Sequence, residues 1–226
     1  MTLLADSDPL ETAAIEDFRK AHPSLQLGPI AVVIPSYREA GSIAGTLERI
    51  PKEIAGHAVR TLVVVDGPDD GAARIAVDHG AYATGTGGSG PRGQGAALRL
   101  GYRIAVAHGA AYLVTIDADG QYLPEEIPAV LAPLLAGEAD FVSGSRRLGE
   151  NGSPDRVRTL GVYVYAAVIS ALTGRHVTDP AFGLRAMTAE VARTVTLRQP
   201  QYQASELLIG AAMHGYRLAE RPGTIR

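Results

Sequence analysis

The segment TIDADGQYLP places two carboxylates, Asp117 and Asp119, two residues apart. They directly follow an apolar run over residues 111–116 that predicts a buried strand. Neighbouring carboxylates repel each other and raise each other's pKa, so a divalent cation is the first candidate to offset the repulsion. Mg²⁺ or Mn²⁺ is usually held by one or two carboxylates together with substrate phosphates, and Gln121 adds a neutral oxygen. A solvated turn that caps a helix is the alternative interpretation.

Short apolar runs alternate with helical segments through the first two thirds of the chain. The predicted strands cover residues 30–34, 61–65, 112–116 and 141–143, with a further short one at 82–84. The predicted helices cover residues 42–50, 70–79, 96–108 and 125–135. Continuous apolar strands separated by helices indicate an α/β fold, with a Rossmann-like, mostly parallel central sheet and helices on both faces. In such sheets ligands bind beyond the carboxyl ends of the strands.

Polar groups follow the predicted strands at this ligand-binding edge. They occur at residues 35–39, 66–71, 117–121 and 144–147. Asp66 could accept a hydrogen bond from a nucleobase or a ribose hydroxyl, or it could cap the next helix. The glycine-rich segment 85–95 would let the main chain approach a ligand closely, and a plain flexible loop is the competing interpretation.

Arg146, Arg147 and Arg185 are the candidate counter-charges for a phosphorylated ligand. The guanidinium group can hold a phosphate through two parallel hydrogen bonds. A surface salt bridge is the ordinary explanation for any single arginine, but two arginine-bearing loops beside acidic strand ends favour phosphate binding.

The composition limits the classes of protein. The chain has 226 residues, of which 46% are hydrophobic, and its net charge is −3. A packed core is therefore feasible, and a dedicated nucleic-acid binder is disfavoured because phosphate neutralisation needs a basic surface. There is no cysteine, which excludes disulfides and fits a reducing compartment. We see no apolar run of the ~18 residues that a spanning helix needs, and the N-terminus is too acidic for a signal peptide. We expect a cytoplasmic protein with at most peripheral membrane contact.

A series of motifs resembles the family 2 glycosyltransferases, which have the GT-A fold. VVIPSYREAGSI resembles the opening V-I-P-x-Y-N-E, with Arg38 for the usual Asn, and VVVDGPDDGA resembles V-V-D-D-G-S-x-D-G-T, with Val65 for the first Asp. GQGAALRLGY resembles G-K-G-A-A-L-R-x-G, with Gln94 for Lys, and DADGQYLPEEI is a close match to D-A-D-G-Q-H-x-P. GSRR and DPAFGLRAM resemble motifs of the polyprenyl-phosphate sugar synthases, the dolichyl-phosphate mannose synthase group. The resemblance covers roughly residues 30–225.

The resemblance implies a complete nucleotide-sugar site. It places the donor at Pro35, Tyr37, Glu39, Asp66, Gly95, Asp117, Ala118, Asp119 and Arg146. It assigns the cation, Mg²⁺ or Mn²⁺, to Asp117, Asp119 and Gln121. Arg146 and Arg185 are implied to bind phosphates, and Asp179, which opens the last motif, is a candidate catalytic acid residue.

The implied reaction is a metal-dependent, inverting transfer of a hexose from GDP-mannose or a UDP-hexose to an acceptor, with a polyprenyl phosphate favoured. A lipid phosphate is already anionic and needs no base, whereas a hydroxyl acceptor needs a general base within reach. Asp179 or Glu206 would be that base, and Arg185 would hold a phosphate. A capping or salt-bridging role is as good an explanation for Glu206.

Departures from the family pattern keep two other functions open. Phe182 and Leu184 replace the Ser and Phe of the lipid-phosphate subgroup, which favours a soluble hydroxyl acceptor. Val65 and Gln94 leave room for a nucleotide-binding module without transferase activity. The donor base, the sugar and the oligomeric state, including a homodimer, are left open by the sequence.

We expect a helical arm at residues 1–28 that serves as a packing element, followed by one GT-A domain over 29–226. Residues 29–148 would form its nucleotide-sugar and metal half and residues 149–226 its acceptor half. The acceptor half is predicted to contain a helix at 157–172, a loop at 179–185, a helix at 205–214 and a strand at 217–220. Residues 156–172 could dock on a membrane, although a buried helix is the simpler interpretation. The sequence stops at Arg226, shortly after the last predicted strand, where relatives usually continue, so an acceptor loop could be missing.

Overall fold

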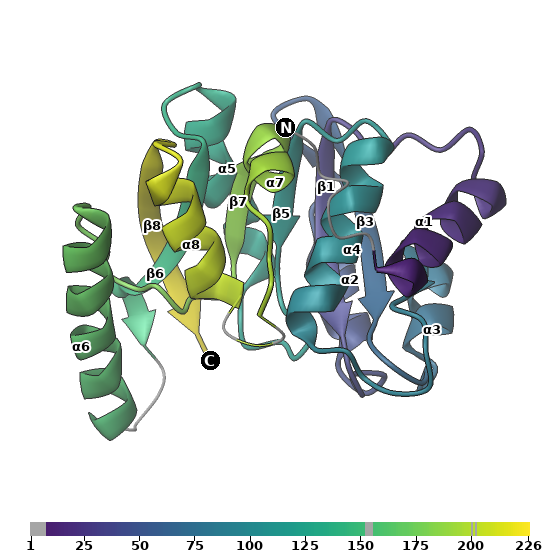
Figure 1. Cartoon of the computed structure of the whole chain (residues 1–226), viewed down its shortest axis with the longest axis horizontal. Helices are drawn as coiled ribbons and strands as arrows, with labels where there is room; N and C mark the ends of the chain where they lie inside the picture. The colour runs from purple at the N-terminus through teal and green to yellow at the C-terminus, as the bar shows by residue number, and fades with distance from the viewer. Residues whose placement is uncertain (1–7, 152–155, 200, 202) are drawn as a thin grey trace.

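The apolar runs form the centre of one mixed sheet in the computed structural model, which describes residues 8–151, 156–199, 201 and 203–226 (Figure 1). The strands are β1 (Ile30–Ser36), β2 (Glu53–Ile54), β3 (His57–Val65), β4 (Tyr82–Gly85), β5 (Tyr112–Thr115), β6 (Phe141–Asn151), β7 (Arg185–Thr188) and β8 (Leu218–Ile225). Their order in the sheet is β2-β3-β1-β5-β7-β6-β8, with β4 paired to β3.

The helices connect these strands and cover both faces of the sheet. They are α1 (Pro9–Ala21), α2 (Ile43–Arg49), α3 (Ala72–Asp78), α4 (Gln94–Ala107), α5 (Ile127–Leu135), α6 (Arg156–Thr173), α7 (Ala189–Thr194) and α8 (Gln203–Met213). A short 3₁₀ turn, Pro124–Glu126, precedes α5. The first seven residues of the predicted arm lie outside the described residues; the rest of it contains α1.

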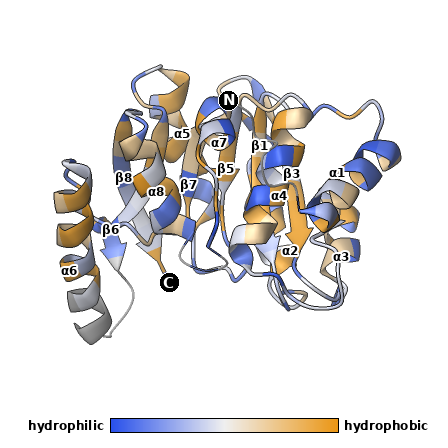
Figure 2. Cartoon of the chain, in the orientation of Figure 1, coloured by the Kyte–Doolittle hydropathy of each residue, from blue (hydrophilic) through white to orange (hydrophobic). Residues whose placement is uncertain are grey.

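Alternate side chains of β1 pack into cores on opposite faces of the sheet, which explains why the strand is a continuous apolar run in the sequence. Ile30, Val32 and Ile34 pack into one core with residues of α2, α3 and α5. Ala31 and Val33 pack into the opposite core with residues of α4, α7 and α8. Both faces of the strand are therefore buried, and Figure 2 shows most of its ribbon as hydrophobic.

Pairing is mostly parallel, as predicted. β1 pairs in parallel with β3 and β5, β3 with β4, and β6 with β8. The exception that matters for the site is β7, which runs antiparallel between β5 and β6. The predicted loop at 179–185 is wrong at its last residue, because Arg185 begins β7 and pairs with Thr115 and Ser143. A four-residue strand is too short to show a periodicity of its own.

The outer strands are longer than predicted. β6 runs to Asn151 rather than ending at Ser143, and β8 runs from Leu218 to Ile225 rather than ending at Glu220. The two strands pair with each other through a shift in register between Ser145 and Glu150. Their extensions are polar or glycine-rich, so only the partner strand reveals them.

The interpretation of residues 157–172 as a buried helix is wrong for the side chains that the structure describes. Tyr163, Val164, Val168 and Leu172 of α6 are exposed, and only a few positions such as Ile169 are buried. Figure 1 shows α6 at the outer edge of the molecule, beyond β6 and β8. Within the described residues, no helix is both long enough and apolar enough to span a bilayer.

Gly101 shows how closely α4 packs on the sheet, and Gly45 in α2 serves as the comparison. A Cβ at Gly101, in the middle of α4, would lie 3.0 Å from Val64 Cγ2 and closer still to Val33, whereas a Cβ at Gly45 in α2 would meet nothing within 4 Å. We expect Gly101→Ala to lower the free energy of unfolding by about 1–3 kcal/mol through overpacking. Gly45→Ala should raise it by about 0.5–1 kcal/mol through helix propensity. Urea unfolding of both variants measures the difference, and equal effects would contradict the packing of α4.

Candidate active site

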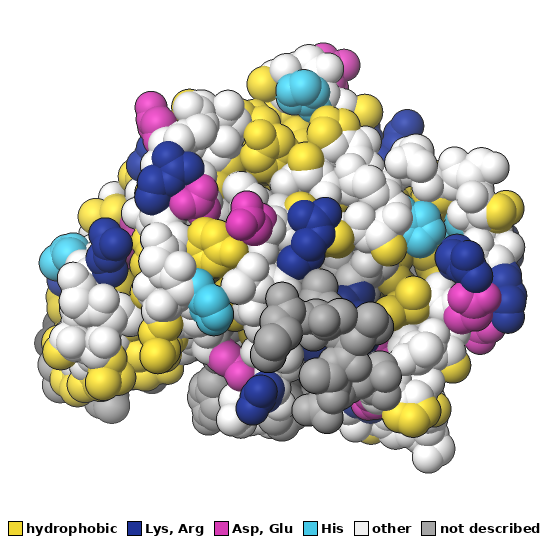
Figure 3. Space-filling view, turned by 45° about the horizontal axis from the view of Figure 1, so that its top comes forward, with side chains coloured by type: hydrophobic (Ala, Val, Ile, Leu, Met, Phe, Trp, Pro, Cys, Tyr) yellow, Lys and Arg dark blue, Asp and Glu magenta, His cyan; other side chains and the backbone are white. Residues whose placement is uncertain are grey.

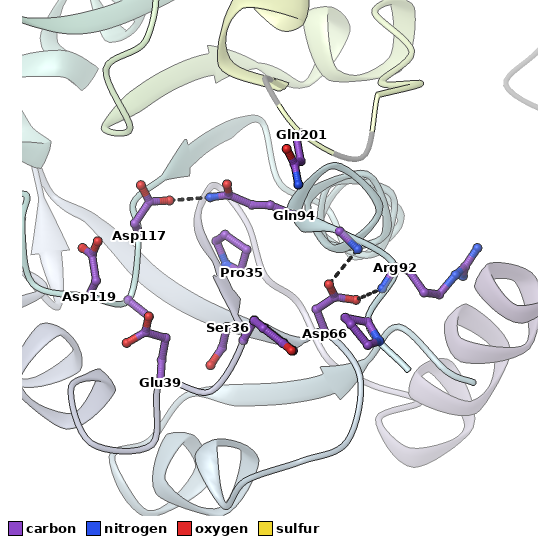
Figure 4. A pocket seen from close by; sticks show the side chains of 13 residues that line it. Pro35, Ser36, Glu39, Asp66, Arg92, Gln94, Asp117, Asp119 and Gln201 are labelled. Carbon is purple, nitrogen blue, oxygen red and sulfur yellow. Dashed lines mark hydrogen bonds between the residues drawn. The ribbon is translucent and has the colours of Figure 1, made fainter. Parts of the chain in front are cut away.

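A cavity of about 660 Å³ opens at the carboxyl ends of β1, β3 and β5 (Figure 4). It is lined by Pro35, Ser36, Tyr37 and Glu39 from β1 and the turn after it, by Asp66 after β3, by Pro91, Arg92, Gly93 and Gln94 around the start of α4, by Asp117, Ala118 and Asp119 after β5, and by Gln201. Seven of the nine predicted donor-site residues thus share one cavity, and the other two, Gly95 and Arg146, do not line it. Four of the lining side chains are carboxylates, so the wall is strongly acidic.

Asp117 is the lining carboxylate with a clearly raised pKa. Its pKa is raised to about 6, chiefly by burial and in smaller part by Asp119 and Glu39, although the nearby Arg185 guanidinium lowers it. Gln94 Nε2 donates a hydrogen bond to Asp117 Oδ1 at 2.7 Å, which also favours the charged form. The charged carboxylate is therefore unfavourable here in the absence of a bound cation.

The donor set suits a hard divalent cation. Asp117, Asp119 and Glu39 offer carboxylate oxygens, the ligand type that Mg²⁺ and Mn²⁺ prefer. Over the described part of the chain, no three His, Cys, Asp or Glu side chains converge closely enough to hold a metal ion by themselves. A cation bound at Asp117 and Asp119 would thus complete its shell with ligand or water oxygens, as Mg²⁺ commonly does with phosphates.

Gln121, the third predicted metal ligand, is not among the residues that line the cavity. Its main-chain N–H donates to Asp119 Oδ1 at 3.0 Å, and its carbonyl accepts from the Arg226 N–H at 3.1 Å. In this structure its visible contribution is to orient Asp119 and to join the turn to the last residue of the chain.

Asp66 pins the glycine-rich segment. Its Oδ1 accepts from Thr86 Oγ1 at 2.9 Å and from the Arg92 N–H at 2.8 Å, and its Oδ2 accepts from the Gly93 N–H at 2.8 Å (Figure 4). The capping role foreseen for Asp66 therefore acts on the residues before α4 rather than on the next helix. The segment is thus held at both ends of its glycine run, while Oδ2 accepts only one hydrogen bond among the described residues and has acceptor capacity left.

The turn after β1 presents an exposed aromatic ring to the cavity. Tyr37 is 44% exposed, and the Arg38 guanidinium lies 5.3 Å from the centre of its ring. Arg38 has φ of 58°, a left-handed conformation that Asn tolerates better than Arg, which explains the Asn of the family pattern. Ser36, which the sequence prediction omitted, is buried beside this turn, and its hydroxyl has no hydrogen-bond partner among the described residues.

The predicted phosphate-binding and catalytic residues Arg146, Asp179 and Arg185 are not among the residues that line this cavity. Arg146 and the fully buried Asp179 form an ion pair, with Nε 2.6 Å from Oδ2. Arg185 is buried, and its Nε donates to the Phe182 carbonyl at 2.7 Å. Its Nη1 has no hydrogen-bond partner in the described part of the chain. Arg185 is thus a buried cation near Asp117 whose Nη1 could donate a hydrogen bond to a ligand.

Glu206 and Gly95 are also placed elsewhere. Glu206 accepts from the Arg198 and Gln199 N–H groups at 2.9 and 3.1 Å and lines a second cavity, of about 610 Å³, beside α8. Gly95 is buried in the first turn of α4, and its neighbours Gly93 and Gln94 line the donor cavity instead. The salt-bridging or capping alternative for Glu206 agrees with its two main-chain contacts.

Two further residues of the site had weak signals or none in the sequence. Gly183 lies so close to the acidic wall that a Cβ there would be 2.5 Å from Asp117 Oδ2. Gln201 reaches the cavity from the segment between α7 and α8, as Figure 4 shows. The glycine belongs to a quoted motif, but no local pattern marks Gln201, because only the packing of a distant segment brings it here.

Comparison with known proteins decides the family. Residues 31–196 match the sequence profile described as glycosyl transferase family 2. The chain belongs to this family. It is therefore a glycosyltransferase, and the module without transferase activity is no longer needed as an explanation.

Relatives of this glycosyltransferase include proteins that act on lipid-linked acceptors according to their names. A dolichyl-phosphate hexose transferase of Haloferax volcanii is 32% identical over 193 residues, which are 85% of this chain and 81% of the relative. An undecaprenyl-phosphate mannosyltransferase of Micrococcus luteus is 28% identical over 85% of this chain and 79% of its own. An uncharacterised protein of Methanocaldococcus jannaschii is 32% identical over the same shares.

Solved structures share the fold of this glycosyltransferase. Glucosyl-3-phosphoglycerate synthase from Mycobacterium tuberculosis, in complex with Mn²⁺, UDP and phosphoglyceric acid, superimposes with a TM-score of 0.67 at 20% identity, over 100% of this chain and 77% of that one. A complex of the same enzyme with Mg²⁺ and UDP gives a TM-score of 0.67 at 22% identity, over 94% and 75%. At this identity the likeness establishes the fold alone, a GT-A glycosyltransferase fold.

The raised pKa of Asp117 predicts a site that costs stability. Its folded-state pKa of about 6 lies above the usual value of 3.8, so the folded glycosyltransferase favours the protonated acid. The stabilisation that protonated Asp117 gives to the folded state is complete below pH ~4 and is lost as the pH rises through ~6. We expect Asp117→Asn, which stays neutral, to raise the free energy of unfolding by roughly 1–3 kcal/mol near neutral pH without added metal. The gain should shrink as the pH falls towards ~4. Urea unfolding across this range measures it, with Asp17→Asn, at an exposed carboxylate of α1, as the control; a gain independent of pH would contradict the prediction.

Proposed function

We propose that this glycosyltransferase moves a hexose from a nucleotide sugar, GDP-mannose or a UDP-hexose, to a polyprenyl phosphate, with the help of Mg²⁺ or Mn²⁺. The observation that carries the proposal is the pair Asp117 and Asp119 in one cavity with Asp66 and Tyr37, at the carboxyl edge of the sheet. A nucleoside diphosphate needs both a cation for its phosphates and a platform for its base, and this cavity offers residues for each.

The donor would lie across the cavity from Asp66 to Asp119. Pro35, Tyr37 and Asp66 would receive the base and the ribose, and Asp117 and Asp119 would hold the cation. The complexes of the solved neighbours with UDP and Mn²⁺ or Mg²⁺ support this assignment through the shared fold. A bound cation of this type stabilises the departing diphosphate as a Lewis acid.

The positions of the acidic residues favour an acceptor that needs no general base. Asp179 is fully buried and paired with Arg146, and Glu206 lies beside another cavity and holds main-chain N–H groups. A phosphate oxygen of a polyprenyl phosphate is already anionic and could attack the anomeric carbon directly. The bond from that carbon to the diphosphate breaks on the opposite side, so the configuration inverts. The free Nη1 donor of Arg185, buried near Asp117, is suited to the added negative charge.

The two departures from the lipid-phosphate pattern concern packing. Phe182 and Leu184 are both fully buried. The Phe182 ring fills the space that Gly144 and Gly223 leave open, because a Cβ at either glycine would collide with it. These replacements therefore give little support to a soluble hydroxyl acceptor, and the names of the lipid-phosphate relatives favour the lipid.

The exposed face of α6 supports peripheral contact with a membrane on the cytoplasmic side. Tyr163, Val164, Val168 and Leu172 form an exposed apolar strip, and Figure 3 shows hydrophobic side chains gathered at this end of the molecule. Arg147 stacks on Tyr163 at 3.9 Å, which brings a cation to the edge of the strip where lipid headgroups would lie.

Donor turnover should depend on the cation and on Asp119. We expect hydrolysis of, or transfer from, the preferred nucleotide sugar to stop in EDTA and to return with Mg²⁺ or Mn²⁺. Asp119→Ala should lower kcat/KM by at least about a hundredfold, because the leaving diphosphate loses its counter-charge. Asp78→Ala, which removes an exposed carboxylate at the end of α3, is the matched control and should leave turnover unchanged. Full activity in the chelator would contradict the proposal.

The acceptor can be identified together with the role of α6. Val168→Glu should lower turnover of a polyprenyl phosphate embedded in vesicles by about tenfold, because a charge on the docking face opposes membrane binding. Turnover of a short, water-soluble polyprenyl phosphate should not change. Val77→Glu is the control, since Val77 on α3 is 56% exposed and Val168 is 48% exposed. Turnover with sugars or other hydroxyl acceptors alone would overturn the lipid-phosphate assignment.

A further inference from the structure

The N-terminal helix α1 lies beside the donor site although it precedes the part of the chain that matches the family. Its first turn contacts the glycine-rich segment through Leu10, and the helix also contacts α4 and β4. Phe18, near the far end of α1, is buried among residues of α4 and the strands. Packing explains Phe18, but it does not explain the charged residues at the other end of the helix.

Glu11 is the unusual residue of α1, because its carboxylate is only 2% exposed. Its Oε2 accepts from Arg99 Nε at 2.7 Å and its Oε1 from Arg103 Nη1 at 2.8 Å, both on α4. Arg99 also donates through Nη1 to the Leu197 carbonyl at 2.8 Å. One buried carboxylate therefore connects α1 through Arg99 to the segment that leads, four residues later, to Gln201 in the wall of the cavity.

The start of α1 contacts the other part of the wall. Asp8 caps the helix by accepting from the Leu10 N–H at 3.0 Å, and it forms an ion pair with Arg92. The Arg92 side chain runs away from Asp117 and Asp119, as Figure 4 shows, and its Nη1 donates to the Thr86 carbonyl at 3.2 Å. Leu10 lies against the glycine run: a Cβ at Gly88 would be 3.4 Å from it.

We propose that α1 is a strap that positions two parts of the donor cavity, and that Glu11 is its positioning residue. Asp8 and Leu10 hold the glycine-rich segment whose N–H groups bind Asp66, and Glu11, in the same first turn, fixes Arg99 and thereby Leu197, four residues before Gln201. The proposal rests on the proposed function, since the ligand positioned is the nucleoside diphosphate. A glycine-rich segment loses much conformational entropy when it is ordered, and a ligand binds more weakly if it must supply that ordering itself.

The first test is Glu11→Gln in the full-length chain, with Glu16→Gln as the control. Glu16 is an exposed carboxylate on the same helix that pairs only with Arg19 and Lys20 among the described residues. Calorimetric titration with UDP and with GDP, each in the presence of Mn²⁺, should show the Kd of the preferred nucleotide about tenfold higher in Glu11→Gln and unchanged in Glu16→Gln. With the nucleotide sugar, KM should rise by a similar factor while kcat changes by less than about twofold.

Two α4 arginines separate positioning from loss of stability. Arg99 and Arg103 both pair with Glu11 and are 26% and 21% exposed, but only Arg99 holds the Leu197 carbonyl. Arg99→Met should raise the Kd by about tenfold and Arg103→Met by less than about threefold, at similar losses of Tm. This pair carries the test if Glu11→Gln does not fold.

Trypsin cleavage after Arg198 gives a readout that needs no ligand. Without nucleotide, Glu11→Gln and Arg99→Met should be cut faster at this exposed bond than wild type and Arg103→Met, because the segment has lost its anchor. Equal Kd values in wild type and Glu11→Gln, or equal weakening by the two arginine variants, would overturn the strap. If wild type binds neither nucleotide while cleavage follows the predicted order, the proposed function is wrong and with it the role of α1 in nucleotide binding.

Discussion

The structure depends on keeping a carboxylate charged in a place that disfavours the charge. Asp117 stands at the end of a buried strand, and burial together with its acidic neighbours raises its pKa to about 6. The features around it can be understood as responses to this constraint. Arg185 enters from β7 as a nearby cation, Gln94 donates a hydrogen bond, and Gly183 leaves room for the carboxylate. Under the proposed function, a cation that arrives with the nucleotide would offset the unfavourable charge of Asp117.

The antiparallel strand β7 is central to this arrangement. It inserts between β5 and β6, so that Arg185, from the C-terminal part of the chain, pairs directly with Thr115, two positions before Asp117. Distant parts of the sequence are thereby joined within one sheet at the site itself. The family pattern usually has Lys where Gln94 stands, and the amide contributes a hydrogen bond to Asp117 but no charge. Arg185 is consequently the cation that matters most to Asp117 in this chain.

A second set of contacts shapes the base end of the cavity. Asp66 is a candidate ligand for the base, yet its carboxylate already accepts three hydrogen bonds that hold the residues before α4 in place. These residues are rich in glycine and would otherwise be costly to order. The first turn of α1 contacts the same region, because Asp8 pairs with Arg92 before α4 and Glu11 pairs with Arg99 on α4.

The sequence by itself determined the strands β1, β3 and β5 and the acidic residues that follow them, because a strand buried on both faces must be continuously apolar and must end where the polar residues begin. It therefore located Asp66, Asp117 and Asp119 at one edge. Only the tertiary structure decided that Arg185 belongs to a strand and that α6 is exposed. It also decided that Gln201 joins the cavity and that Glu11 pairs with α4. Each of these depends on which distant segment packs beside it, and local residue patterns carry no information about contacts made across the fold.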